Sequence, residues 1–213
     1  KNICFFGSSC IYPKESLQPI KEEYLLSGKL EKTNEPYAIA KIAGIKLCES
    51  LNDQYGTNYF CVMPTNLFGP NDNWDIDNGH VLPALIRKVH EAKTQNFKSI
   101  TLWGSGMAKR EFLYVDDLAD ACIFLMNKNI SKGVFNIGYG KDISIFELAT
   151  IIMSTLNYKG NIILDDTKPD GTMRKLLDVS KINNLGWRAS TSLVSGIEKT
   201  YKDFLKNHSN QLK

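Results

Sequence analysis

The stretch from Thr57 to Pro70, TNYFCVMPTNLFGP, joins a run of apolar residues to an exit that contains two prolines. A short continuous apolar run bounded by turn residues is typical of a strand buried on both faces. Pro64 has no N–H to give to a neighbouring strand, so it is excluded from the interior of a sheet. We therefore predict a buried strand that ends at Pro64 and continues into the loop Thr65, Asn66, Leu67.

The segments before this strand predict what it pairs with. Residues 2–6, NICFF, have the pattern of a second buried strand, and it ends in Gly-Ser-Ser-Cys. A helix is expected from about Pro36 to Tyr55, because proline is favoured in the first turn and Ile39, Ile42, Ala43, Ile45 and Leu47 provide apolar positions. Strand, helix and strand at this spacing indicate a parallel β-α-β unit. Ligands of such sheets bind beyond the carboxyl ends of the strands, where GSSC and PTNLFGP both fall.

The rest of the chain continues the alternation of helices and strands. A helix is expected at about 80–93, a strand at 99–106, and a short extended piece running into a helix within 110–128, capped near Asp116. A strand at 133–140, a helix with a capping box from Ser144 to Glu147, a strand at 160–166 and a last helix at 191–207 follow. This order indicates an α/β protein with a parallel sheet.

Composition excludes several functional classes. The chain has 213 residues, 43% of them hydrophobic, which is enough for a real core. The net charge is only +3, with both signs scattered, so no nucleic-acid partner is expected. No apolar run approaches the roughly 20 residues that cross a bilayer, and no signal peptide opens the chain, so no membrane partner is expected. The five cysteines lack metal-type spacing, which favours reduced thiols, a cytoplasmic location and no metal site.

The chain opens directly on the strand-like run KNICFFGSS, and no Gly-x-x-Gly-x-x-Gly follows a strand anywhere in it. Two interpretations fit: a complete small protein that begins in a strand, or the later part of a longer fold. Composition alone leaves both open.

The stretch Asn34–Lys41, NEPYAIAK, places Tyr37 and Lys41 one helical turn apart on one face. An ammonium beside a phenol stabilises the phenolate, which allows the tyrosine to exchange a proton with a substrate. The pair by itself is equally compatible with a surface tyrosine near a solvated lysine. Together with Ser8 and Asn66 at strand ends, it resembles the extended type of the short-chain dehydrogenase/reductase superfamily.

Longer strings narrow the resemblance. GSSCIYP, NEPYAIAKIAGIKLCES, MPTNLFGPNDN, HVLPALIRK, WGSG, REFLYVDDLADA and KPDGTMRKLLDVS are together similar to the GDP-L-fucose synthase family, over nearly the whole chain. The resemblance implies NADPH-dependent 3,5-epimerisation and 4-reduction of GDP-4-keto-6-deoxy-D-mannose to GDP-L-fucose. It also favours the longer fold, because the family's N-terminal part with its glycine-rich cofactor turn is missing here.

The resemblance implies a domain organisation as well. Residues 1–70 would be the later part of a Rossmann-like, doubly wound cofactor domain that carries the catalytic residues. Residues 71–213 would be mainly a smaller α/β region that binds the nucleotide sugar, with a segment at about 108–135 returning to the cofactor domain.

Five residues acquire catalytic roles from the resemblance. Cys10 would be the base and His80 the acid of epimerisation at the two carbons beside the C4 ketone. Ser8 would hydrogen-bond the C4 oxygen and Tyr37 would protonate it, while Lys41 would hold the cofactor ribose. A buried structural cysteine, and a histidine that merely begins a helix, are the alternatives for Cys10 and His80.

Binding residues follow in the same way. The residues expected to contact NADP(H) are Gly7, Ser8, Ser9, Tyr37, Lys41, Pro64, Thr65, Asn66, Leu67 and His80. The residues expected to contact the GDP-sugar are Asn66, Lys88, Trp103, Arg110 and Lys168. Lys88 stands where relatives often have arginine, so a bidentate contact with phosphate is lost there.

Other functions remain open from the sequence. A nucleotide-sugar 4-epimerase or 4,6-dehydratase would share the fold, although dehydratases usually carry acidic residues where this chain has Cys10 and Ile11. A non-catalytic reductase-like binding protein, or an inactive fragment, is the alternative of a different class. The resemblance also implies a homodimer through the helix of Tyr37, and Ile39 and Leu47 would lie either in that interface or in the core.

Overall fold

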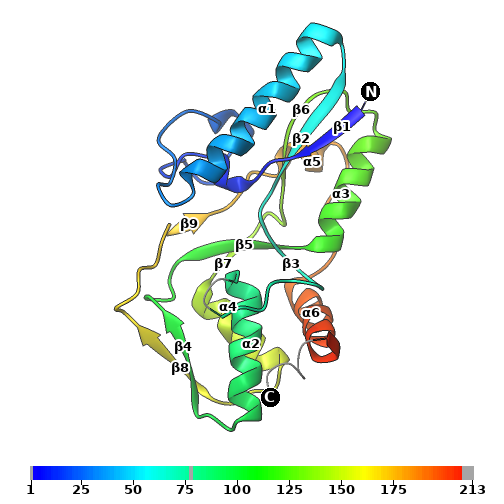
Figure 1. Ribbon diagram of the computed structural model, residues 1–213. Coiled ribbons are helices and arrows are strands. Elements are labelled where there is room, and N and C mark those ends of the chain that lie inside the picture. The colour runs from blue at the N-terminus through cyan, green and yellow to red at the C-terminus, as the bar shows by residue number, and fades with distance from the viewer. Residues whose placement is uncertain (1, 77–78, 208–213) are drawn as a thin grey trace. The chain divides into compact units, whose positions relative to one another are not determined.

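The structure is a computed structural model that describes residues 2–76 and 79–207. The chain forms two compact units, each made of three separate segments. Unit 1 contains residues 1–67, 111–141 and 175–190, and unit 2 contains residues 68–110, 142–174 and 191–213. Figure 1 shows the elements of both units.

Unit 1 is built on a parallel sheet. Its strands are β1 (Asn2–Phe6), β2 (Asn58–Pro64) and β6 (Gly133–Ile137), in the order β1-β2-β6. Phe5 of β1 pairs with Cys61 of β2, and both strand pairs are parallel. Helix α1 (Glu35–Tyr55) makes the crossover between β1 and β2. The predicted β-α-β unit is therefore confirmed.

The central strand β2 is apolar on both sides because both faces of the sheet are covered. Phe60 and Val62 pack into a cluster with residues of α3 (Val115–Asn127), whereas Cys61 and Met63 pack into a second cluster with residues of α1. Successive side chains of a strand point to opposite faces, so alternate residues of one run enter different cores. The sheet is doubly wound, as the sequence predicts.

Further elements complete unit 1 and its connections. They are the short 3₁₀ helices η1 (Ser9–Ile11) and η2 (Glu22–Tyr24) and the helix α5 (Ser180–Asn184). The chain passes from one unit to the other five times. Three of these passages fall within β3 (Asn66–Phe68), β5 (Lys109–Tyr114) and β9 (Arg174–Lys175), one directly precedes β7 (Asp142–Ser144), and one lies between residues 190 and 191. Three short elements, β3, β9 and α5, were not predicted, and the residues of β7 were wrongly assigned to the helix that follows them.

Unit 2 packs three helices beside a pair of strands. The helices are α2 (Val81–Thr94), α4 (Ile145–Thr155) and α6 (Leu193–Asn207), with α4 in contact with both others. The strands are β4 (Ser99–Trp103) and β8 (Asn161–Asp165), which pair in parallel, together with the short β7 (Asp142–Ser144). The rings of Trp74 and Phe204 meet in the core with centroids 4.7 Å apart.

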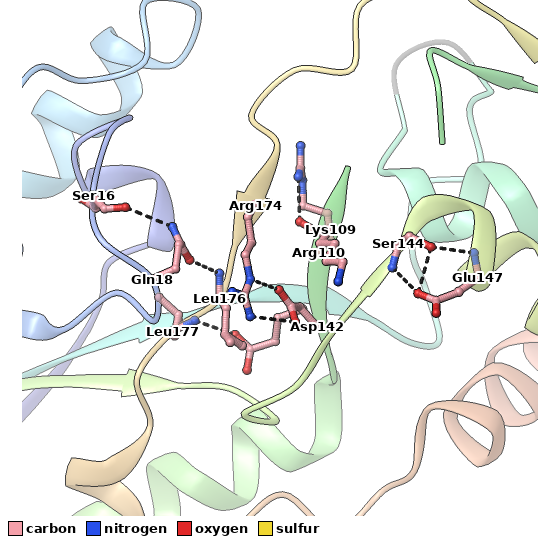
Figure 2. A network of polar contacts seen from close by, with 11 residues as sticks. Ser16, Gln18, Lys109, Arg110, Asp142, Ser144, Glu147, Arg174, Leu176 and Leu177 are labelled. Atoms are coloured by element: carbon pink, nitrogen blue, oxygen red, sulfur yellow. Dashed lines mark hydrogen bonds and ion pairs between the residues drawn. The ribbon is translucent and has the colours of Figure 1, made fainter. Parts of the chain in front are cut away.

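The helix starts show where local sequence rules hold. The capping box of α4 is confirmed: the Ser144 hydroxyl accepts from the Glu147 N–H at 3.1 Å, and the Glu147 carboxylate accepts from the Ser144 N–H at 2.8 Å (Figure 2). The predicted cap of α3 near Asp116 is wrong, because β5 runs directly into the helix and Tyr114 is the cap residue. Asp116 lies in the first turn instead, where a negative charge faces the positive end of the helix dipole.

Helix α1 presents one apolar face to the core and another to solvent. Ala38, Ile42 and Ile45 are buried, whereas Ile39 is 53% and Leu47 59% exposed. Ile39 and Leu47 therefore lie outside the core of this chain. No helix among residues 2–76 and 79–207 is long and apolar enough to span a membrane.

Candidate active site

The carboxyl ends of the three parallel strands of unit 1 lie at one edge of the sheet. The Gly7 N–H, just past β1, donates to the Val62 carbonyl at 2.9 Å, and the Thr65 N–H, just past β2, donates to the Ile137 carbonyl at 3.0 Å. A Cβ added at Gly7 would lie 2.3 Å from the Met63 sulfur, so glycine leaves room for the buried Met63 side chain at this strand end. The segments 7–10 and 64–67 thus share the ligand-binding edge of the fold.

Ser8 and Cys10 are held together by a tight turn after β1. Ser8 caps the 3₁₀ helix η1, and its hydroxyl accepts from the Cys10 N–H at 3.1 Å. Both side chains are half-buried, whereas the neighbouring Ser9 is buried. The Cys10 sulfur also accepts a hydrogen bond from the Lys175 ammonium at 3.5 Å. Nothing in the sequence analysis predicts this contact.

Tyr37 and Lys41 form the expected pair at the start of α1. The Lys41 ammonium lies 5.6 Å from the centroid of the Tyr37 ring. It also donates to the Phe6 carbonyl at 2.8 Å, which ties it to the end of β1. Tyr37 is 49% exposed, so its phenol is open to a ligand. The cation is thus held near the phenol by both the helix and the strand end.

The loop after β2 is anchored by Glu111 of β5. The Glu111 backbone carbonyl accepts from the Asn66 side-chain amide at 2.8 Å and from the Thr65 hydroxyl at 3.2 Å. Its carboxylate, fully buried, accepts from the N–H groups of Gly140 at 2.6 Å and Leu177 at 3.1 Å. Burial raises the pKa of Glu111, and these hydrogen bonds oppose that shift. Glu111 was not predicted, although an acid directly before the apolar run Phe112–Val115 was a usable signal.

Unit 2 contains a cavity of about 250 Å³ with a mixed lining. The apolar residues that line it include Ile76, Val81, Leu85, Leu102 and Ile145, and the polar or charged ones are Lys88, Trp103, Arg110 and Asp170. The Lys88 ammonium lies 5.3 Å from the Trp103 ring centroid. The Lys168 ammonium lies 5.6 Å from the same ring. Two cations therefore lie near one aromatic ring, and that ring lines a largely apolar cavity.

Arg110 and Asp170 give this cavity its opposite charges. Burial lowers the pKa of Arg110, and the negative charge of Asp170 opposes that shift. The Asp170 carboxylate accepts from both the N–H and the hydroxyl of Ser105 at 2.8 Å. Asp170 is a lining residue that the sequence analysis missed. Its position in the KPDGT loop, two residues from the predicted Lys168, was the available signal.

His80 belongs to unit 2 and occupies the N-cap position of α2, but its side chain makes no capping hydrogen bond to the helix. Its Nδ1 atom lies 4.0 Å from a carboxylate oxygen of Asp72, and its side chain is 80% exposed. Burial raises the pKa of Asp72, and the charge of His80 opposes that shift. The imidazole is thus open to solvent or to a ligand beside a carboxylate.

The predicted site residues divide between the two units. Unit 1 brings Ser8 next to Cys10 and Tyr37 next to Lys41, and it holds Gly7, Ser9 and the Pro64–Leu67 loop at the same sheet edge. Unit 2 brings Lys88, Trp103 and Arg110 to one cavity, with Lys168 over the Trp103 ring, and it also contains His80. Within residues 2–76 and 79–207 no group of three or more His, Cys, Asp or Glu side chains could hold a metal ion.

Comparison with known proteins defines the class. The model of the NAD dependent epimerase/dehydratase family matches residues 1–138, and the chain belongs to this family. It is 52% identical over 207 residues to a GDP-L-fucose synthase of Sinorhizobium fredii, which covers 97% of this chain and 66% of that protein. It is 53% identical over 214 residues to the GDP-L-fucose synthase of Escherichia coli, which covers 96% of this chain and 67% of that protein.

A solved structure supports the same grouping. The GDP-L-fucose synthetase from Naegleria fowleri bound to NADP matches with a TM-score of 0.88 at 31% identity, over 98% of this chain and 67% of that one. The chain therefore spans about two thirds of the length of these relatives. The family resemblance drawn from the sequence motifs is confirmed.

Proposed function

We propose that this chain is the part of a GDP-L-fucose synthase that carries its proton-transfer residues and its nucleotide-sugar site. The reaction is the NADPH-dependent 3,5-epimerisation and 4-reduction of GDP-4-keto-6-deoxy-D-mannose. In this proposal unit 1 belongs to the cofactor and catalytic domain, and unit 2 binds the nucleotide sugar. The support is the similarity to enzymes of that name together with the arrangement of Ser8, Cys10, Tyr37 and Lys41.

Reduction of the C4 ketone needs a proton at its oxygen. The nicotinamide, when bound, supplies a hydride to carbon. Tyr37 then protonates the C4 oxygen, and the nearby Lys41 ammonium stabilises the phenolate that remains. The Ser8 hydroxyl donates a hydrogen bond to the same oxygen and keeps its proton, and the loss of such a donor typically costs about 2.7–4 kcal/mol in the barrier.

Epimerisation uses the acidity that the same ketone gives to both neighbouring carbons. Cys10 as a thiolate removes a proton from one of these carbons: the C–H bond breaks, an S–H bond forms, and the electron pair moves to the C4 oxygen as an enolate. His80 returns a proton to the carbon. The resemblance supports this division of roles, and the half-buried position of Cys10 beside Ser8 is compatible with it.

The residues of unit 1 fit a dinucleotide cofactor in their chemistry. Gly7 sits where a strand end needs a small residue, Lys41 offers an ammonium for ribose hydroxyls, and the loop Pro64–Leu67 is fixed by Glu111. These residues would hold the nicotinamide end of NADP(H). The N. fowleri relative, whose structure contains NADP, supports this assignment.

The cavity of unit 2 fits part of a nucleoside diphosphate. Its volume of about 250 Å³ suits a fragment of a ligand rather than a whole one. Trp103 offers a flat face, while Lys88, Arg110 and Lys168 can meet phosphate oxygens. Asp170 adds an acceptor for N–H groups of a base, or for ribose hydroxyls, beside these cations.

One observation carries the proposal: the Lys41 ammonium is fixed near the Tyr37 ring by the carbonyl at the end of β1, in the same unit as Ser8 and Cys10. The test uses the complete protein that contains this chain, with NADPH and GDP-4-keto-6-deoxy-D-mannose in D₂O. We expect NADPH oxidation and deuterium uptake at C3 and C5. Cys10→Ser should lose the deuterium uptake while the variant keeps its fold by circular dichroism. Unchanged uptake would remove Cys10 as the base.

We also propose a cytoplasmic homodimer. The exposed apolar residues of α1, Ile39 and Leu47, are the proposed contact, and the five free cysteines favour a reducing compartment. Sedimentation equilibrium of the complete protein tests the dimer. A monomer at micromolar concentration would contradict it, and Leu47→Glu should shift a dimer toward monomer.

A further inference from the structure

Cys10 and Lys175 are 165 residues apart in sequence, yet the Lys175 Nζ atom lies 3.5 Å from the Cys10 Sγ atom. Both side chains are half-buried, so the contact is partly shielded from solvent. An ammonium stabilises a neighbouring thiolate more than a thiol, and partial burial reduces the screening by water. A lysine in this position therefore bears on how Cys10 ionises.

The Lys175 side of the contact is fixed by its neighbours in the chain. The Leu176 N–H donates to the Gln18 side-chain oxygen at 2.8 Å (Figure 2), and the Leu176 carbonyl accepts from the Ile20 N–H at 2.7 Å. The Leu177 N–H donates to the buried Glu111 carboxylate at 3.1 Å. The backbone that follows Lys175 is thus held in place by hydrogen bonds from the main-chain groups of Leu176 and Leu177.

The segment that carries Cys10 is fixed as well, because the buried side chain of Asn136 bonds both this segment and the residues next to Lys175. Tyr12, two positions on, is buried and donates its hydroxyl proton to the Asn136 side-chain oxygen at 2.6 Å. The Asn136 amide donates in turn to the carbonyls of Ile20 at 2.9 Å and Asp178 at 3.2 Å. Asn136 is fully buried, so losing any of these partners would leave a polar group unsatisfied. One buried amide therefore ties both segments together.

Most charged groups on the elements around η1 have other recorded partners. On α1, Lys41 donates to the Phe6 carbonyl, and Lys46 pairs with Glu49 at 2.8 Å. On η2, Glu22 accepts from the Asn136 N–H at 2.9 Å. Next to Lys175 on β9, Arg174 forms a two-point contact with Asp142 (Figure 2). Among the described residues, Lys175 is the cation that hydrogen-bonds the Cys10 thiol.

We propose that Lys175 is a positioning residue that holds Cys10 in the thiolate form required of an epimerisation base. The proposal rests on the proposed function for the role of the thiolate, but the ionisation of Cys10 can be measured without any substrate. When the thiolate takes the proton from the substrate carbon, the C–H bond breaks, an S–H bond forms, and the negative charge passes to the C4 oxygen of the enolate.

The experiment measures alkylation of Cys10 by iodoacetamide in the 213-residue chain, followed by mass spectrometry of the Cys10 peptide from pH 6 to pH 10. The thiolate sulfur forms a bond to the CH₂ carbon, the C–I bond breaks, and iodide leaves, so the rate reports the thiolate fraction. We expect Lys175→Met to lower the rate at pH 7 by about tenfold, the scale of one nearby opposite charge. The rates of the two proteins should converge toward pH 10, because an ordinary thiol with a pKa of about 8.5 is ionised there without a neighbouring cation.

Two further variants separate charge from structure. Lys175→Arg keeps the positive charge and should retain most of the rate at pH 7. Lys21→Met removes the same charge from an exposed lysine whose recorded partner is Glu23 at 3.8 Å, and it should match the unmodified chain. Circular dichroism should show the same fold for all four proteins.

Four outcomes decide the matter. If Lys175→Met leaves the alkylation rate at pH 7 unchanged, the inference is overturned. It is also overturned if the variant reacts as slowly relative to the unmodified chain at pH 10 as at pH 7, because the substitution would then have changed the access of iodoacetamide to Cys10 and not the ionisation of the thiol. An unfolded Lys175→Met protein leaves the arginine variant, whose rate must stay near that of the unmodified chain. If the complete protein fails to exchange deuterium while alkylation still depends on Lys175, the proposed function falls and the thiolate assignment stands.

Discussion

The two units place their candidate functional groups in different ways. In unit 1, Ser8 and the loop Thr65–Asn66 follow directly from strand ends, and main-chain atoms hold them. In unit 2, Lys88 of α2 and Trp103 of β4 meet Lys168, which comes from a loop more than sixty residues further along the chain. The first arrangement depends on backbone register, and the second on how separate side chains pack.

This difference has consequences for tolerance to substitution. Unit 1 relies on buried polar groups such as Asn136 and Glu111, each with several hydrogen bonds, so removing one leaves others unsatisfied. The cations of unit 2 lie over an aromatic ring that is itself 47% exposed, and such contacts contribute little to stability. A single substitution in the site of unit 1 should therefore reduce function strongly, whereas a single substitution of a cation in unit 2 should reduce it less.

The largest effect is expected at Tyr37. Tyr37→Phe removes the proton donor but keeps the ring, so NADPH oxidation by the complete protein should fall by about 10²–10⁴-fold, the usual contribution of a general acid. The measurement is the absorbance of NADPH with the 4-keto sugar nucleotide. Tyr55→Phe, at the exposed far end of α1, is the matched control and should keep full activity. Full reduction by Tyr37→Phe would refute the assigned role.

A smaller effect is expected in the cavity of unit 2. Lys88→Met keeps the length of the side chain and removes its charge, so KM for the GDP-sugar should rise about tenfold with kcat little changed, as loss of one hydrogen bond to a charged group implies. Lys128→Met is the control, because Lys128 lies over Phe124 in unit 1 at 5.4 Å. A fall in kcat with KM unchanged would place Lys88 in the chemistry rather than in binding.

The capping box of α4 tests stability in unit 2 without touching the cavity cations. Ser144→Ala removes the acceptor for the Glu147 N–H and should lower the free energy of unfolding by about 1 kcal/mol. Urea denaturation measures this change. Ser154→Ala, at an exposed position near the other end of the same helix, should leave stability nearly unchanged. Equal midpoints for the two variants would show that the box contributes nothing.

The smallest effect is a pH dependence that originates in unit 1. Burial raises the pKa of Glu111 above that of the unfolded chain, so the native state binds the proton more tightly. The stabilising contribution is complete below the unfolded pKa of about 4.5 and is lost as pH rises through the higher native pKa. Glu111→Gln cannot titrate, so its unfolding free energy should fall less over that range. Parallel pH profiles for the two proteins would contradict this assignment.

Much of the fold was predictable because its signals are local. The apolar run of β2, the proline that ends it, and the helix between β1 and β2 are all confirmed. The start of α3 was predicted wrongly near Asp116, because β5 passes straight into the helix and its last residue, Tyr114, is the cap residue. The short strands β3 and β9 leave no periodicity to detect, since a pattern needs several residues to repeat.

The candidate site was predictable to a similar extent. Tyr37 and Lys41 share a helix face by their spacing alone, and the structure brings the ammonium near the ring. Glu111, Asp170 and Lys175 were missed because each acts on residues far from it in the sequence. The split of α1 into a buried face and an exposed face also needed the structure, since isoleucine and leucine occupy both.

The sequence by itself determined the order of the longer strands and helices, the strand ends that carry Ser8, Cys10 and Asn66, and the pairing of Tyr37 with Lys41. These depend on residue periodicity and on backbone rules that act within a few positions. Only the tertiary structure decided that Lys175 reaches Cys10, that Glu111 anchors the loop after β2, and that two lysines converge on Trp103. Such contacts depend on how packed elements bring distant segments together, and no local pattern encodes that geometry.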